Sequence, residues 1–97
     1  MAKGYWVSSY RKILDPDGLA AYGKLATAAI AAGGGRIIVR GVAAYASGAG
    51  IQERTVIVEF DSLESAFSTY QSDAYKAALT ALGNAVERDF RIVEGAE

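Results

Sequence analysis

The stretch Gly33-Gly34-Gly35-Arg36-Ile37-Ile38-Val39-Arg40-Gly41 decides how this sequence folds. Consecutive glycines are typical of the end of a helix, because glycine adopts the backbone angles that terminate a helical turn at little cost. The branched apolar residues that follow favour a strand. Successive side chains of a strand point to opposite faces of a sheet, which predicts Arg36 and Arg40 on one face and Ile37 and Val39 on the other.

The segment before the glycines has the features of a helix from Pro16 to about Ala32. Asp15 is suited to cap its first turn, and proline is well tolerated at the first helical position. Apolar residues recur on one side of it at helical spacing: Leu19, Tyr22, Ala26, Ala29 and Ile30. A strand is predicted before this helix, from Tyr5 to Tyr10.

After the strand that begins at Arg36, the sequence predicts a second strand that forms a hairpin with it, a helix that is bent once, and a final strand. The hairpin pairs 36–45 with 55–60, because small turn residues fill positions 46–50. Asp61-Ser62-Leu63-Glu64 resembles a capping box with Asp61 as the cap. The helix is interrupted at Ser72-Asp73 and continues over 74–82, and the last strand covers 89–94.

The resulting order, β-α-β-β-α-β, predicts an α+β, ferredoxin-like fold in a single domain over residues 1–97. Its four-stranded antiparallel sheet carries both helices on one face. The opposite face needs cover, and two such sheets packed together would form a dimeric α+β barrel. A hydrophobic content of 52%, with ten aromatic residues in 97, favours such a homodimer.

Composition excludes several function classes. The net charge is −1 and the basic residues are dispersed, so we expect no nucleic-acid partner. No apolar run approaches the roughly 20 residues of a membrane span, and the first residues do not resemble a signal peptide, so we expect no membrane association and a cytoplasmic protein. The sequence has no cysteine and no histidine. We therefore expect no metal and no cofactor, and any catalysis must use carboxylates, hydroxyls, lysine, arginine or backbone groups.

Short motifs along nearly the whole chain resemble the domain-of-unknown-function 1330 family, in the dimeric α+β barrel superfamily. They are Tyr5-Trp6-Val7, Asp15-Pro16 with Tyr22, the stretch 34–41, Val58-Glu59-Phe60-Asp61-Ser62, the segment 70–75 and Val93-Glu94-Gly95. The resemblance implies the fold and the dimer but no settled activity. Relatives in the superfamily include cofactor-independent monooxygenases, haem-degrading enzymes, lactone isomerases and stress-response proteins.

Glu59 is the most conspicuous candidate for a functional residue, because it interrupts an apolar strand. Val56, Val58 and Phe60 would face the helices, so Glu59 would face the barrel interior, where an arginine could satisfy it. Two readings remain open: Glu59 is a catalytic base beside Arg36 and Arg40, which hold an anion, or these residues form a structural ion pair. A symmetric hairpin would separate Glu59 from both arginines, so an uneven loop or a bulge at Gly41 is needed to bring them together.

Aromatic residues supply the other candidates for ligand binding. Trp6, with Ser8 and Tyr10 on the same side of the first strand, would form the wall of a pocket. Tyr70 and Tyr75 flank the helix break and could close a pocket as phenol donors. Ordinary core packing is the alternative for each of them.

Two functions are compatible with these features. The first is binding, or transformation without a cofactor, of a small organic anion or aromatic compound by Arg36, Arg40, Glu59 and Trp6. The second is a non-catalytic dimeric module for stress response or protein interaction, in which the same charges are structural.

Overall fold

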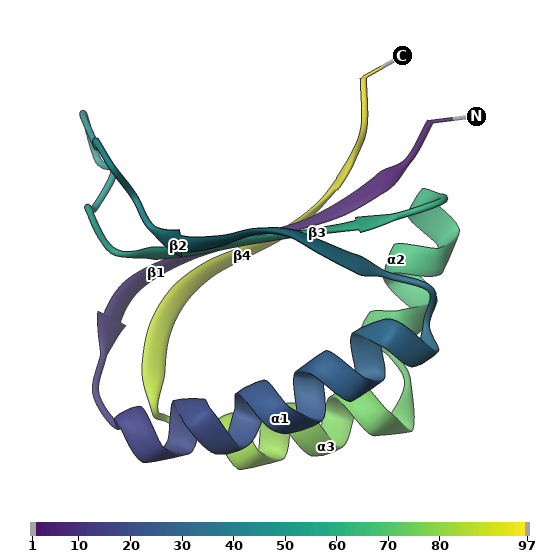
Figure 1. The fold of residues 1–97 in the computed structure, drawn as a ribbon, viewed down its shortest axis with the longest axis horizontal. Helices are drawn as coiled ribbons and strands as arrows, with labels where there is room; N and C mark the ends of the chain where they lie inside the picture. The colour runs from purple at the N-terminus through teal and green to yellow at the C-terminus, as the bar shows by residue number, and fades with distance from the viewer. Residues whose placement is uncertain (1, 97) are drawn as a thin grey trace.

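The computed structural model describes residues 2–96, which form one four-stranded antiparallel sheet covered by helices on one side (Figure 1). The elements are β1 (Gly4–Ile13), α1 (Pro16–Ala32), β2 (Arg36–Val42), β3 (Arg54–Phe60), α2 (Leu63–Tyr70), α3 (Asp73–Leu82) and β4 (Val86–Glu94). The strand order is β2-β3-β1-β4. This arrangement is the predicted ferredoxin-like fold, with the second helix divided into α2 and α3.

Helix α1 has the predicted bounds for the predicted reasons. The Asp15 carboxylate accepts a hydrogen bond from the backbone N–H of Asp17 at 3.1 Å, and Pro16 begins the helix. The helix ends at Gly33, whose N–H donates to the carbonyl of Ala29, and Gly34 has a φ of +81°. At Gly35 an added Cβ would lie 2.7 Å from the ring of Phe60, so the chain needs glycine to pass this side chain.

The cap predicted for the second helix was wrong by one residue. Ser62, not Asp61, caps α2, because its hydroxyl accepts a hydrogen bond from the N–H of Ser65 at 3.1 Å. The predicted interruption at 72–73 is confirmed, since Ser72 caps α3 in the same way through the N–H of Tyr75 at 3.2 Å. Because Ser72 caps a new helix, α3 begins there as an element separate from α2.

A bulge in β2 overturns the predicted distribution of its side chains. Arg36 lies opposite Glu59 and Ile37 opposite Val58, but Val39 lies opposite Ile57. Ile38 is therefore an extra residue, and it exchanges the faces of everything that follows it. Arg36 and Arg40 consequently lie on opposite faces of the sheet, not on one face as predicted, and Val39 faces away from the helices.

We call the face that the helices cover the inner face and the opposite one the outer face. Trp6 forms the centre of the inner face: it is 2% exposed, its indole N–H donates to the carbonyl of Ala66 at 3.0 Å, and its ring contacts those of Phe60, Tyr75 and Phe90. These aromatic contacts hold the sheet and the helices together over the middle of the sheet.

The outer face has no covering element among residues 2–96, as Figure 1 shows. The cross-strand neighbours Val39, Ile57 and Val7 form an apolar row across three strands of this face. Val39 is 43% exposed, and Val93 at the edge strand is 44% exposed. No helix within residues 2–96 is both long and apolar enough to cross a membrane.

Candidate functional site

A small cavity of about 30 Å³ lies between the inner face and α1. Its walls come from β1, β3, β4 and α1, and include Trp6, Ser8, Tyr22, Val56, Arg88 and Phe90. With Ile30 and Val58, which also line it, most of the lining side chains are apolar, so the few polar groups determine what the cavity can bind. We call it the inner cavity. Its volume suits one or two water molecules or one small functional group.

Arg88 is the charged residue of the inner cavity. It lies opposite Tyr10 on β1, and alternation along β4 directs its side chain to the inner face together with Phe90. One terminal nitrogen donates to the hydroxyls of Ser8 at 3.3 Å and Tyr22 at 3.2 Å, and the other donates to the hydroxyl of Tyr75 at 3.1 Å. Arg88 is half-buried, and its guanidinium lies against the rings of Tyr22 and Phe90.

Two tyrosines complete the polar cluster of Ser8, Tyr22, Tyr75 and Arg88, which we call the arginine–tyrosine cluster. The hydroxyls of Tyr22, on α1, and Tyr75, on α3, are 2.6 Å apart and share one hydrogen bond. Burial is the main cause that raises the pKa of Tyr75 above its ordinary value, so this phenol stays protonated at neutral pH. Tyr75 is therefore a neutral hydrogen-bonding group rather than a base.

The arginine–tyrosine cluster has more donors than acceptors. One tyrosine hydroxyl donates to the other, but the second phenol proton and the Ser8 proton have no acceptor within residues 2–96. No carboxylate of the described residues forms an ion pair with Arg88. A site with one cation, two unused hydroxyl donors and no anion is suited to hold the oxygen atoms of an anion.

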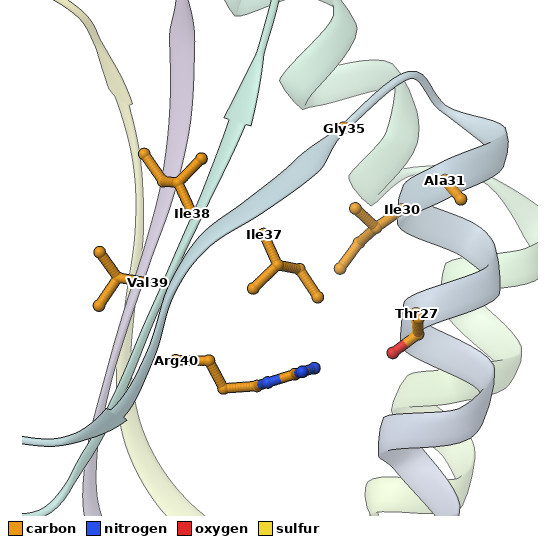
Figure 2. Close-up of a pocket in the computed structure, with 8 residues that line it drawn as sticks. All are labelled: Thr27, Ile30, Ala31, Gly35, Ile37, Ile38, Val39 and Arg40. Carbon is orange, nitrogen blue, oxygen red and sulfur yellow. The ribbon is translucent and has the colours of Figure 1, made fainter.

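A second, larger pocket of about 400 Å³ opens beside the inner cavity, between α1 and β2 (Figure 2). Figure 2 shows the side chains of Ile37 and Arg40 directed toward α1, whereas Ile38 and Val39 are directed away from it, as the bulge requires. We call this second space the outer pocket, although it lies on the inner face of the sheet. Ile30 lines both the outer pocket and the inner cavity. The two spaces therefore share one isoleucine side chain in their walls.

Glu59 and Arg36 lie together on the outer face, remote from the inner cavity. Two nitrogens of Arg36 donate to one Glu59 oxygen at 3.0 and 3.2 Å, and the Tyr5 hydroxyl donates to the other oxygen at 3.0 Å. Arg36 also pairs with Asp61 at 3.1 Å. The predicted pairing of Glu59 with an arginine is thus confirmed for Arg36, and the bulge places Arg40 outside it.

The environment of Glu59 favours its charged form. The hydrogen bond from Tyr5, followed by that from Arg36, holds the pKa of this carboxyl below its ordinary value. A lowered pKa makes a carboxylate a weaker base. Both charges already have partners on this face. The catalytic role of Glu59 and the anion-binding role of Arg36 stay predictions.

The predicted aromatic candidates lie on the inner side of the sheet. Trp6 lines the inner cavity and Tyr75 belongs to the arginine–tyrosine cluster. Tyr70 packs edge-on against Trp6 at a ring distance of 6.0 Å, and it is only partly buried. The structure brings Trp6, Tyr70 and Tyr75 into one aromatic group, and their ligand-binding role stays a prediction.

Sequence reasoning missed Arg88 and did not use Tyr22 as a site residue. The last strand was predicted to begin at Asp89, one residue after Arg88, whereas β4 begins at Val86. The signal was available in the alternation, because Arg88 precedes Phe90 and Ile92 at intervals of two. An arginine in phase with the apolar face of a strand is a candidate for a buried cation.

Comparison with known proteins identifies the family. The family model for a domain of unknown function, DUF1330, matches residues 3–96. The chain belongs to the DUF1330 family. No functionally curated protein matches this member of the family.

Three solved structures illustrate the likeness of this DUF1330 protein to known folds. RPA0582, a protein of unknown function from Rhodopseudomonas palustris, is 16% identical with a TM-score of 0.73, over 99% of this chain and 84% of that one. A dimeric ferredoxin-like protein of unknown function from Thermobifida fusca is 13% identical, with a TM-score of 0.64 over 96% and 91%. SnoaB, a cofactor-independent oxygenase from Streptomyces nogalater, is 9% identical, with a TM-score of 0.67 over 100% and 96%. At these identities the likeness establishes the fold.

Proposed function

We propose that this DUF1330 protein binds a small organic anion, a carboxylate or phenolate, with its negatively charged oxygen atoms in the inner cavity. The observation that carries the proposal is the donor excess of the arginine–tyrosine cluster: Arg88 has three hydroxyl partners and no carboxylate partner among the described residues. A bound oxyanion would neutralise the guanidinium and accept the unused hydroxyl protons of the cluster.

The same donors would support chemistry as well as binding. Groups that are fixed around an oxygen atom stabilise negative charge that develops on it during a reaction, such as the charge of an enolate. This requires no cofactor, and the fold is shared with SnoaB, a cofactor-independent oxygenase. The proposal is therefore an anion-binding protein that is also able to polarise its ligand.

The proposal includes a homodimer that forms through the outer face. This face has no covering element among residues 2–96 and carries the apolar row of Val39, Ile57 and Val7. Its Arg36 and Arg91 are paired with carboxylates. The structurally similar protein from Thermobifida fusca is dimeric, which supports the proposal. Self-association there would leave the inner cavity, on the opposite side of the sheet, open to ligands.

Titration of acids against their neutral amides tests the proposed function. Trp6 is the single tryptophan of the chain and lines the inner cavity, so its fluorescence reports on occupancy. We expect acetate and benzoate to change this fluorescence saturably, and acetamide and benzamide to have no effect at the same concentrations. Arg88→Gln should weaken benzoate binding at least tenfold, and Arg88→Lys should weaken it less because it keeps the charge.

Arg91→Gln is the matched control, because Arg91 lies on the same strand but is exposed and bonded to Asp89 at 3.0 Å. It should bind benzoate as the wild type does. Circular dichroism and thermal melting would verify that each variant folds. Equal responses to acids and amides, or an unchanged affinity in folded Arg88→Gln, would overturn the proposal and favour the alternative interaction module.

A further inference from the structure

We propose that the ligand carries two acidic groups joined by a short apolar body. The first group would occupy the inner cavity at Arg88, the body would pass Ile30, and the second group would bind Arg40 in the outer pocket. This inference rests on the proposed function and specifies its class of ligand as a dicarboxylate or a compound with a carboxylate and a second oxyanion.

The size of the inner cavity limits what it can admit. Its volume of about 30 Å³ accommodates a group as small as a carboxylate but not an aromatic ring or an aliphatic chain. Phe90, Val56 and Trp6 enclose it on the sheet side, and the last is 2% exposed. The rest of any organic anion must therefore leave the cavity, and the outer pocket lies directly beside it.

Ile30 connects the two spaces. Its side chain is 5% exposed and lines both of them, so a ligand that reaches Arg88 from the outer pocket passes this residue. The register of the sheet supports the same connection, because Arg40 of the outer pocket is the cross-strand neighbour of Val56 of the inner cavity. A ligand that spans both spaces would contact the apolar side chain of Ile30 between its two polar ends, which suits a hydrocarbon body there.

Arg40 is the charged residue that lines the outer pocket, and it would bind the second acidic end. Figure 2 shows the Arg40 side chain extending from β2 toward Thr27 of α1, below the apolar side chains of Ile37 and Ile30. The guanidinium of Arg40 makes no hydrogen bond or ion pair with another residue of 2–96. The Thr27 hydroxyl already donates to the carbonyl of Gly23 at 2.8 Å, so its oxygen can accept but the residue offers no free donor.

The charge of the inner face also favours a doubly charged ligand. Arg54 is a third arginine on this face: it lies over the ring of Tyr10 at 5.9 Å, and its buried Nε atom has no hydrogen-bond partner. No described carboxylate pairs with Arg40, Arg54 or Arg88. Arg40 is exposed to solvent, and a dianion would place one acidic group at Arg40 and the other at Arg88.

The spacing of the strands sets the length of the ligand. Arg40 and Arg88 are on β2 and β4, which are three strand spacings apart, or about 14 Å between backbones. The Arg88 guanidinium lies 3.3 Å from Ser8 of β1, one strand closer to β2, which shortens the span. Two acidic groups on the order of 10 Å apart or less, as on a chain of six to eight carbons, would bridge the remaining distance.

Matched pairs of monoacids and diacids test this inference. Hexanoate and adipate have the same number of carbons, as do octanoate and suberate, so each pair differs only in the group at the far end. We expect at least one diacid to bind the wild type tenfold more tightly than its monoacid, by Trp6 fluorescence and calorimetry. Arg40→Gln should abolish this advantage and leave the affinity for the monoacid within twofold of the wild type.

Arg36→Gln is the control, because Arg36 lies on the same strand as Arg40 but on the outer face. It should retain the diacid advantage. If monoacids bind through Arg88 but no diacid binds more tightly, or if the advantage survives Arg40→Gln, the inference is overturned and the proposed function stands. If neither kind of acid binds the folded wild type, both are overturned.

Discussion

The arginines on the two faces of the sheet differ in their partners. On the outer face, Arg36 is bonded to Glu59 and Asp61, and Arg91 is bonded to Asp89. On the inner face, Arg88 is surrounded by hydroxyls and aromatic rings, and no described carboxylate accompanies it. The difference separates charges that are already neutralised within the chain from a charge that can still bind an anion.

The same comparison assigns a different task to each face. Neutralised charges around an apolar row make the outer face suitable for contact with a second copy of the chain, since such pairs can be desolvated at lower cost than single charges. The enclosed cation on the inner face attracts a ligand more strongly than an exposed one would, because the surrounding rings exclude water. Two adjacent layers of the molecule could therefore support assembly and binding separately.

The largest expected effect comes from two neighbouring residues of β1 that face opposite ways. Trp6→Ala should lower the free energy of unfolding by about 3–5 kcal/mol, because it removes the buried ring between the sheet and the helices. Val7→Ala, on the outer face, should lower it by less than Trp6→Ala does, because it removes only two methyl groups from a partly buried side chain. Urea denaturation at one fixed protein concentration measures both.

The comparison fails if the two substitutions destabilise the protein equally. A milder pair guards against a Trp6→Ala variant that does not fold at all. Trp6→Phe retains most of the aromatic packing but loses the indole hydrogen bond to Ala66, and it should still be more damaging than Val7→Ala.

The next effect concerns assembly and tests the outer face alone. Ile57 lies between Val7 and Val39 in the middle of the apolar row. Ile57→Asp should convert the proposed dimer into a monomer, because it places an unpaired charge at the centre of the interface. Sedimentation velocity measures the mass, and Ile57→Val, which keeps the apolar surface, is the control.

Ligand binding separates this effect from general damage. Because Ile57 faces away from the inner cavity, a folded Ile57→Asp monomer should bind benzoate with wild-type affinity. A variant that stays dimeric, or a wild-type protein that is already monomeric, would contradict self-association through the outer face.

Apolar periodicity, helix caps and turn residues were together sufficient to predict the order of the elements and the fold. The bounds of α1, the hairpin and the helix break at Ser72 all follow from local patterns and from caps. The Glu59–Arg36 pair could also be predicted from the sequence, provided that the hairpin contained a bulge. These features depend on interactions between residues that are near in sequence or in register.

The arginine–tyrosine cluster was beyond that reasoning because it joins four separate elements. Ser8, Tyr22, Tyr75 and Arg88 come from β1, α1, α3 and β4, and only the packing of helices on the sheet brings their polar atoms together. The wrong prediction that Arg36 and Arg40 share one face has a single cause, the extra residue Ile38. One extra residue in β2 moved Arg40 to the inner face, and no local pattern distinguishes Ile38 from its apolar neighbours.

The smallest expected effect is a difference in pH dependence between the faces. The Tyr5 and Arg36 hydrogen bonds lower the pKa of Glu59 from its ordinary 4.5, so the folded protein binds this proton less readily than the unfolded chain does. The stabilisation is therefore complete above pH 4.5 and is lost as the pH falls through the lower folded value. In urea denaturation, wild type and Glu59→Gln should differ most near neutral pH and converge in acid; a gap that persists unchanged at pH 3 would contradict this.

The inner face should show no such dependence over the neutral range. The chain has no histidine, no described carboxylate pairs with Arg88, and the raised pKa of Tyr75 keeps its phenol protonated. Benzenesulfonate, whose charge does not change with pH, should therefore bind with the same affinity at pH 5.5 and pH 8. A change greater than threefold would mean that a titrating group contributes to the inner cavity, and the contrast between a neutralised outer face and a permanently cationic inner face would no longer hold.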